Sequence, residues 1–320
     1  MMGEKATIRD VFIEGIYRRM HEDKDIFFLC ADFGSPKLDA LREQFPDRFI
    51  NVGIAEQNLI NVATGLALEG YSVYAYAIAP FLTMRCYEQI RVNLALHAQL
   101  KEININLIGV GAGLSYDVSG PTHHCLEDIS IMRSLPNIEV FSPSDWILAR
   151  EFIDYSLQEK KPKYLRFDGK PVEQIYTDPS IISFKKGFTE LHRGDRVCII
   201  STGYMTHKAL SIVKKFHSEQ IPIGLIDAYM LKPFDEKAFY RLASKYSCLI
   251  TLEEGFTGKA GLDGLVAKIL VDQNSAIRLI RMGFDDKYVF DIGTREYLHK
   301  LQKLDEAEIT SRIRVLLSES

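Results

Sequence analysis

The sequence predicts an α/β protein with two domains, each built around a parallel sheet. Short apolar runs of strand length alternate with segments of helical periodicity along nearly the whole chain, which is typical of parallel strands joined by right-handed crossover helices. The chain has 320 residues, which is long for one α/β domain and sufficient for two. The alternation stops between residues 168 and 187, a segment that contains Pro171 and Pro179. We therefore expect a linker there.

The first domain is expected to span residues 1–172. Apolar residues at helical spacing predict a helix over residues 55–68, and a polar turn with Asp32 and Gly34 follows the first strand. Residues 142–145, Ser-Pro-Ser-Asp, place oxygen atoms where they can cap the next helix. The predicted strands cover residues 26–30, 73–79, 103–110, 138–141 and 164–167, and a further helix covers residues 86–98.

The second domain is expected to span residues 188–320, after a linker over residues 173–187. The same alternation returns in this part of the chain, which predicts a second parallel sheet with helices. Its predicted strands are residues 197–201, 223–228 and 248–252, and its predicted helices are residues 208–217, 236–246 and 262–272.

Composition and charge narrow the class of protein. The chain is 47% hydrophobic and 26% charged, as in soluble globular proteins, and its net charge of −4 gives no reason to expect nucleic acid or a membrane as partner. The first ten residues are polar, unlike a secretory signal, and no apolar run approaches the roughly 20 residues of a membrane span. The five scattered cysteines form no C-x-x-C pair. We therefore expect a cytoplasmic protein with reduced thiols and no metal site.

The densest chemical signal is the segment N-V-G-I-A-E-Q-N, residues 51–58. A glycine-led turn places Glu56 in the first turn of an otherwise apolar helix. One interpretation is a carboxylate that the helix macrodipole stabilises. The other is a carboxyl group that is held in a site for chemistry.

Two further segments carry reactive or ring-bearing side chains. His123 and His124 follow the turn S-G-P-T at residues 119–122, and residues 81–91, F-L-T-M-R-C-Y-E-Q-I-R, mix aromatic rings with arginines. Paired histidines in such a turn can be simple surface residues, and no Cys/His spacing beside them implies a metal. The aromatic segment alone could be an ordinary amphipathic helix.

The order of these segments resembles one family. G-I-A-E-Q, the Y-E-Q-I-R segment, G-P-T-H, and then L-E-D-I-S-I-M-R-S-L-P-N-I-E-V-F-S-P-S-D resemble the pyrimidine-binding domain of the transketolase family. Residues 197–270, with L-K-P-F-D and E-E-G, resemble the C-terminal domain of that family. The resemblance covers essentially the whole chain and is closest to the C-terminal subunit of transketolases that are split into two polypeptides.

The resemblance implies a thiamine diphosphate cofactor. In the family, the glutamate that matches Glu56 hydrogen-bonds N1′ of the aminopyrimidine, which allows the cofactor to remove its own thiazolium proton. Phe81 and Tyr87 match the aromatic pocket around the pyrimidine ring. Asp32 and Ser35 match a loop that approaches the cofactor, and Ser35 is also expected near the substrate.

The resemblance also assigns substrate contacts. His123 matches a catalytic histidine that contacts substrate hydroxyls and transfers or orients a proton. Arg166 matches a substrate-anchoring arginine whose fork suits a phosphate or carboxylate. Arg9 and Arg85 are further candidates of that kind.

Three positions depart from the family pattern. Ser119 stands where transketolases have an acidic residue that contacts a substrate hydroxyl, and Gly111 stands where they have a histidine that contacts the sugar phosphate. His124 stands where many relatives have glutamine. These substrate-site positions, Ser119 and His124 included, imply a modified or differently anchored sugar as substrate.

A motif of the family is absent. The family holds the cofactor diphosphate through Mg²⁺ on a separate domain with a G-D-G motif, and this sequence contains no G-D-G. The resemblance therefore implies an N-terminal partner subunit that holds the diphosphate and Mg²⁺, with an α₂β₂ assembly as the minimum.

The expected function is transfer of a two-carbon ketol unit between sugars, with this chain as the C-terminal subunit of the enzyme. Two alternatives stay open. One is the β subunit of a 2-oxo acid dehydrogenase or a synthase that condenses pyruvate with an aldehyde, and the other is a non-catalytic regulatory subunit that retains the fold. The G-P-T-H turn favours the transketolase, and Glu56 with His123 favours a catalytic subunit.

Overall fold

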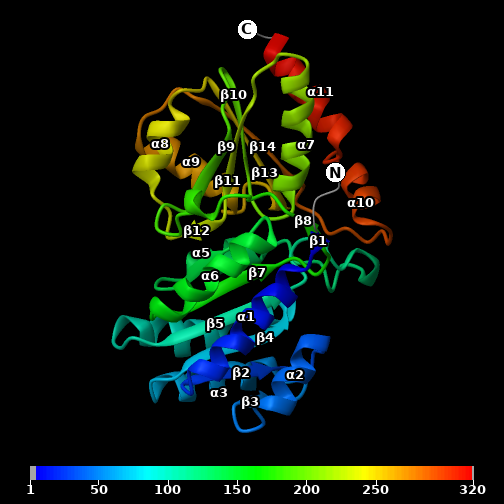
Figure 1. Ribbon diagram of the computed structural model, residues 1–320. Helices are drawn as coiled ribbons and strands as arrows, with labels where there is room; N and C mark the ends of the chain where they lie inside the picture. The colour runs from blue at the N-terminus through cyan, green and yellow to red at the C-terminus, as the bar shows by residue number, and fades with distance from the viewer. Residues whose placement is uncertain (1–4, 319–320) are drawn as a thin grey trace.

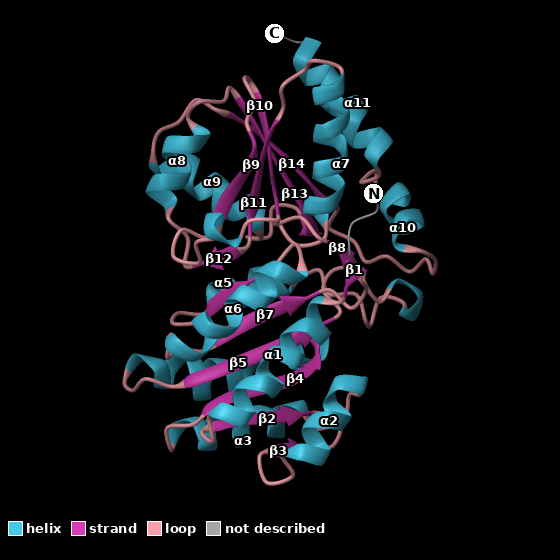
Figure 2. Cartoon of the chain, viewed as in Figure 1, coloured by secondary structure: helices cyan, strands magenta, loops and turns pink. Residues whose placement is uncertain are grey.

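The computed structural model describes residues 5–318, so the ends of the two predicted domains, residues 1–4 and 319–320, lie outside the described residues. It confirms two α/β domains with mostly parallel sheets, one below the other in Figure 1. In both, helices lie on either side of the strands (Figure 2). No helix within the described range is both long and apolar enough to cross a membrane.

The first domain is organised around a seven-stranded sheet in the order β12-β6-β7-β5-β4-β2-β3. All neighbouring strands are parallel except β12, which pairs antiparallel with β6. The strands are β2 (Ile26–Cys30), β3 (Phe49–Asn51), β4 (Ser72–Ile78), β5 (Asn104–Val110), β6 (Glu139–Phe141), β7 (Lys163–Phe167) and β12 (Met230–Lys232).

Helices cover both faces of this sheet. One face buries apolar side chains of α3 (Glu56–Leu68), of the helical segments η1 (Phe81–Arg85), α4 (Tyr87–Gln89), η2 (Ile90–Leu96) and η3 (His97–Gln99), and of α5 (Asp128–Ser134). The other face buries those of α1 (Ile8–Glu22), α2 (Pro36–Gln44) and α6 (Trp146–Gln158). Asp145 caps α6 by accepting from the Leu148 N–H at 3.0 Å, as the sequence predicts.

The second domain has a five-stranded sheet in the order β14-β13-β10-β11-β9, in which only β9 is antiparallel to its neighbour. Its strands are β9 (Phe188–His192), β10 (Val197–Ser201), β11 (Gly224–Ala228), β13 (Cys248–Phe256) and β14 (Arg278–Phe284). Helices α8 (Glu236–Ala243) and α9 (Leu262–Asp272) pack on one face, and α7 (Met205–Ser218), α10 (Arg295–Leu301) and α11 (Glu306–Ser318) on the other.

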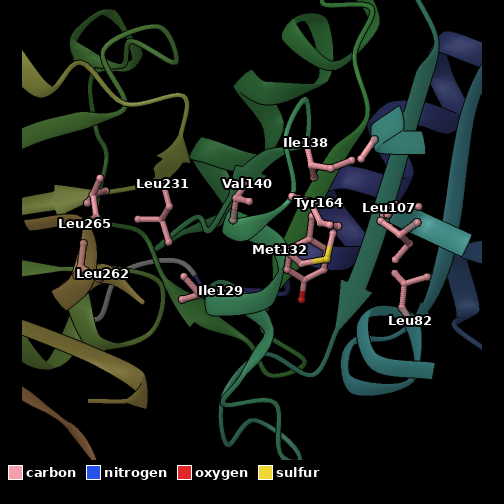
Figure 3. Close-up of a cluster of buried hydrophobic side chains, with 14 of the residues drawn as sticks. Leu82, Leu107, Ile129, Met132, Ile138, Val140, Tyr164, Leu231, Leu262 and Leu265 are labelled. Atoms are coloured by element: carbon pink, nitrogen blue, oxygen red, sulfur yellow. The ribbon is translucent and has the colours of Figure 1, made fainter. Parts of the chain in front are cut away.

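The two domains share a continuous apolar core. Figure 3 shows Leu82 and Leu107 of the first domain in one cluster with Leu262 and Leu265 of the second, bridged by Ile129 and Met132 of α5. A short ribbon of β1 (Lys5–Ala6) and β8 (Val172–Glu173), with the 3₁₀ turn η5 (Pro179–Ile181), lies in the N-terminal and linker segments.

Most predicted elements appear near their expected positions, with one correction. Both sheets are mostly parallel, as predicted, and each has in addition one antiparallel edge strand, β12 or β9. The helix expected over residues 86–98 is broken into α, π and 3₁₀ turns, and helical structure already begins before Phe81, at residue 79.

Candidate active site

Most of the predicted site residues follow the carboxyl ends of the strands in the first sheet. Asp32 follows β2, Glu56 follows β3, Phe81 follows β4 and the turn with His123 follows β5. Because parallel strands end at the same edge of a sheet, their following loops meet there, which is where ligands bind in open α/β sheets. Sequence segments that lie far apart in the chain are thereby brought to one edge of the domain, as the contacts below show.

Glu56 is a buried carboxylate at the start of α3. Its residue is 3% exposed, and the residue before the helix, Ala55, gives no side-chain cap. Oε2 accepts a hydrogen bond from Nη1 of Arg85 at 2.6 Å. Within residues 5–318 no hydrogen-bond donor reaches Oε1 of Glu56. The carboxylate is thus held by one cation and keeps one acceptor for another group.

Arg85, Phe81 and His123 continue from Glu56 in a chain of contacts. The Arg85 guanidinium lies 4.6 Å from the centroid of the Phe81 ring, and its side chain is 45% exposed. The Phe81 ring meets the His123 ring edge-on at 5.2 Å. Nδ1 of His123 lies 3.1 Å from the Thr122 hydroxyl. Four predicted site residues therefore form one contiguous group, which we call the Glu56 group: Glu56, Arg85, Phe81 and His123.

Tyr87 and Arg166 lie apart from the Glu56 group. The Tyr87 hydroxyl donates to the Ile131 carbonyl at 3.1 Å and lies 2.9 Å from the Ser134 hydroxyl, both in α5. Arg166 is 3% exposed. Its Nε donates to Asp128 at 2.8 Å and its Nη2 donates to the carbonyls of Cys125 and Glu254. Among the aromatic candidates, Phe81 is thus the one in contact with His123, and the Arg166 fork is occupied by protein groups.

A second group of predicted residues surrounds Arg9. Its Nε donates to Oδ1 of Asp10 at 2.8 Å, and the Ser35 hydroxyl donates to the same oxygen at 3.1 Å. Ser35 also caps α2. Burial alone would raise the pKa of Asp10. The hydrogen bonds from Arg9 and Ser35 and the charge of the guanidinium outweigh burial, so the pKa of Asp10 is lowered. Arg9 therefore presents a cation that its neighbour already neutralises.

Asp32 lies on the turn between β2 and α2 in the left-handed backbone region, with φ of 49°. Its Oδ1 accepts from the Asn51 amide at 2.9 Å, and the Asn51 amide oxygen accepts from the backbone N–H groups of Asp32 and Gly53. Asp32 therefore links the end of β2 to the turn that leads into Glu56.

Tyr116 fills the space beside Gly111, at the end of β5. Gly111 has φ of +101°, and a Cβ at this position would lie 2.3 Å from the Tyr116 ring. The same ring lies 3.1 Å from the Cβ position of Gly169. Any side chain at position 111 would therefore overlap the tyrosine ring unless one of the two moved.

His124 and Ser119 flank the G-P-T-H turn in opposite environments. Ser119 is exposed, whereas His124 is 5% exposed. Neither ring nitrogen of His124 has a hydrogen-bond partner among the described residues. Burial lowers the pKa of His124. Its ring is thus buried, and burial disfavours its charged form.

The geometry fits the pyrimidine end of thiamine diphosphate. The cofactor would need a carboxyl group for a ring nitrogen and an aromatic wall. Oε1 of Glu56, which no donor of the described residues reaches, provides the first, and the Phe81 ring, joined to Glu56 through Arg85, provides the second. No cluster of three or more His, Cys, Asp or Glu side chains suited to a metal occurs within residues 5–318.

Comparison with known protein families identifies both halves of the chain. A sequence model of the transketolase pyrimidine binding domain matches residues 4–172, and one of the transketolase C-terminal domain matches residues 188–309. The chain is 29% identical over 310 residues to a subunit of an apulose-4-phosphate transketolase of Actinobacillus succinogenes, covering 96% of this chain and 97% of the relative. It is also 29% identical to a 6-deoxy-6-sulfo-D-fructose transketolase subunit of a Clostridium species, covering 96% and 93%.

A solved structure shows the same relationship. A split-gene transketolase solved as an inactive β₄ tetramer superposes with a TM-score of 0.85 at 28% identity, covering 98% of this chain and 99% of that chain. The described fold, the Glu56 group and these matches lead to one assignment. The chain belongs to the transketolase family, and over nearly its whole length it is similar to the C-terminal subunits of transketolases that are split into two polypeptides.

Proposed function

We propose that this chain is the C-terminal subunit of a split, thiamine-diphosphate-dependent transketolase, which transfers a two-carbon ketol unit between sugars. The observation that carries the proposal is the Glu56 group: a buried carboxylate with one oxygen that no donor of residues 5–318 reaches, connected through Arg85 to an aromatic ring and a histidine. A regulatory subunit would have no need to bury a carboxylate that has one oxygen without a donor among the described residues. Burying a polar group without a hydrogen-bond partner costs free energy.

Each residue of the Glu56 group has a task in this reaction. Thiamine diphosphate, when bound, supplies the carbon nucleophile. Oε1 of Glu56 would hold the ring nitrogen of the aminopyrimidine by sharing a proton with it, and Arg85 fixes the other carboxylate oxygen in an ion pair. Phe81 provides the aromatic wall. His123, oriented by Thr122, orients a substrate hydroxyl and takes up or returns its proton.

The proposal requires an N-terminal partner subunit. The chain has no G-D-G motif with which to hold a diphosphate through Mg²⁺. Large apolar side chains are exposed on the segments that carry Glu56 and Arg85, which is the signature of an interaction surface. These side chains are Ile54, Met84, Val92, Leu96 and Leu100. We infer that the partner covers these side chains in an α₂β₂ assembly. We also infer that the assembly is cytoplasmic, because the five cysteines are free thiols, which stay reduced in that compartment.

The substrate is proposed to be a modified or differently anchored sugar. Arg9 is already paired with Asp10, and Tyr116 occupies the space beside Gly111. Both features weaken an anion site for an ordinary sugar phosphate at this edge. The names of two relatives point the same way, because those proteins are named for apulose 4-phosphate and for 6-deoxy-6-sulfo-D-fructose.

A substrate panel with the partner subunit tests the proposal. The complex, supplied with thiamine diphosphate and Mg²⁺, should transfer ketol units from modified ketoses with higher kcat/KM than from xylulose 5-phosphate to ribose 5-phosphate. Housekeeping efficiency on the two pentose phosphates would contradict the substrate proposal. Decarboxylation of 2-oxo acids without ketol transfer would contradict the function itself.

A further inference from the structure

The C-terminal domain contacts the loop that carries His123, which we define as the His123 loop, residues 111–125. We propose that Glu254 and Arg295 of the C-terminal domain are positioning residues for this loop, and so for His123. This inference rests on the proposed function, because the two residues are inferred to position His123 for the proposed ketol transfer. Neither residue touches the Glu56 group directly.

Glu254 lies against the start of the His123 loop. It belongs to β13, is buried, and its Oε2 accepts from the Leu114 N–H at 3.4 Å. A Cβ added to Gly113 would lie 2.0 Å from the same oxygen. The loop backbone therefore passes the Glu254 carboxylate at a distance that only glycine permits, with φ of +57° at Gly113.

Arg295 holds the middle of the loop and also holds Glu254. Its backbone N–H donates to Oδ2 of Asp117 at 2.7 Å. Its Nε and Nη2 donate to the two Glu254 oxygens at 2.7 and 2.6 Å, and its Nη1 lies 2.7 Å from Oδ2 of Asp168. Lys170 pairs with Asp117 from the first domain. One bidentate arginine thus ties two points of the loop to the second domain.

The charges make this arrangement sensitive to the loss of one member. Arg295 and Glu254 are both nearly fully buried, and their attraction, with the His299 contact, keeps the pKa of Glu254 well below its usual range despite burial. Removing one partner of a buried pair leaves an uncompensated charge. The planar guanidinium of Arg295 also fixes the orientation of the Glu254 carboxylate, which the ammonium group of a lysine would not do.

The held points determine where His123 sits. Gly113 and Cys125 exchange backbone hydrogen bonds at 3.0 and 2.9 Å, which closes the loop at its base. The His123 N–H donates to the Gly120 carbonyl at 3.0 Å within the same turn. With Leu114 and Asp117 fixed, the turn has little freedom to move His123 away from Phe81.

The test compares the adjacent glutamates of β13. Glu254→Gln should weaken the hold on the loop, and Glu253→Gln is the matched control, because Glu253 is equally buried but accepts from Leu262 and Asp263 at the start of α9. In the lone chain, amide hydrogen exchange of residues 113–124 should be about tenfold or more faster in Glu254→Gln than in wild type. Glu253→Gln should leave those amides unchanged.

In the complex with the partner, Glu254→Gln should lower kcat of ketol transfer about tenfold or more with little change in KM for the donor, because His123 is misplaced and not removed. Arg295→Lys, which keeps the charge and the backbone donor, should show the same changes to a smaller extent and serves where Glu254→Gln does not fold. Wild-type loop exchange in both variants would overturn the inference. A wild-type complex without ketol transfer would overturn the proposed function instead, and the exchange result would still stand.

Discussion

At the scale of single residues, the sequence alone leaves two interpretations of Glu56 open, a carboxylate stabilised at a helix start or a carboxyl group held for chemistry, and the structure is compatible with both. Glu56 lies in the first turn of α3, where the helix macrodipole stabilises a carboxylate. That role would be served equally by an exposed side chain. The structure adds burial, the Arg85 ion pair and an oxygen without a donor among the described residues. These features are what a site for a ring nitrogen requires.

Glu56→Gln should therefore abolish turnover and leave the fold intact. The amide cannot share a proton with the aminopyrimidine as a carboxylate does, and loss of a general acid–base or electrostatic group typically costs about 10²-fold or more. The partly exposed ion pair with Arg85 contributes only about 1 kcal/mol at most to folding. Steady-state kinetics of the complex and thermal unfolding of the chain measure the two effects.

Glu69→Gln provides the control for that change. Glu69 is an exposed glutamate that ends the same helix, α3. It should behave as wild type in both measurements. Near-normal activity of Glu56→Gln would remove Glu56 from the mechanism.

At the scale of elements, the turn after β5 depends on a glycine. Gly111→Ala should lower the free energy of unfolding by about 1–3 kcal/mol, because a Cβ meets the Tyr116 ring and the φ of +101° disfavours any side chain. Gly34→Ala, where no atom lies within 4 Å of the added Cβ, should stay within about 0.5 kcal/mol of wild type. Denaturant midpoints of the two variants measure this, and equal midpoints would show that Tyr116 yields to a side chain at position 111.

Some strands and helices could be predicted from the local sequence pattern, and others could not. The buried central strands β2 and β10 were predictable because short, mostly continuous apolar runs mark them. The strand β12 was not, because three residues in a loop-like segment become a strand only by pairing with β6 of the other domain. The irregular helical turns from Phe81 onward have no sequence signature of comparable strength.

In the candidate site, too, the residues in local motifs were predictable and those defined by contacts between distant residues were not. Glu56, Phe81 and His123 could be found because each lies in a short motif whose order resembles a known family. Asp10 and Tyr116 are ordinary residues by local pattern and gain their roles from contacts with Arg9 and Gly111. The contact from Arg295 to Asp117 spans 178 residues of sequence, which no local motif encodes.

At the scale of the whole molecule, the domains are joined by a buried carboxyl group as well as by apolar packing. Asp227 of β11 accepts from Ser144 of the first domain at 2.6 Å, from Tyr176 of the linker at 2.8 Å and from Thr206 of α7 at 2.8 Å. Three hydroxyl donors from three parts of the chain thus converge on one side chain. Burial nevertheless raises the pKa of Asp227 to about 7.

This raised pKa predicts a pH dependence of stability. The unfolded chain has an aspartate pKa of about 4, so the stability that protonated Asp227 contributes is fully present below that pH and is lost as the pH rises through about 7. Between pH 5 and 7 this single group lowers the free energy of unfolding by at most about 1.4 kcal/mol per pH unit. Asp227→Asn should show a shallower fall over that range in denaturant titrations. An unchanged slope would mean that Asp227 is ionised in the folded protein.

We propose that this chain forms half of an active site, with Glu56 for the pyrimidine end of a cofactor whose diphosphate a partner subunit holds. The most direct measurement is ketol transfer while a subunit with the G-D-G domain is titrated into a fixed amount of this chain, with thiamine diphosphate and Mg²⁺ present. Activity should be absent from each chain alone, rise with added partner and saturate at one partner per chain. Full activity from this chain without the partner would contradict the claim.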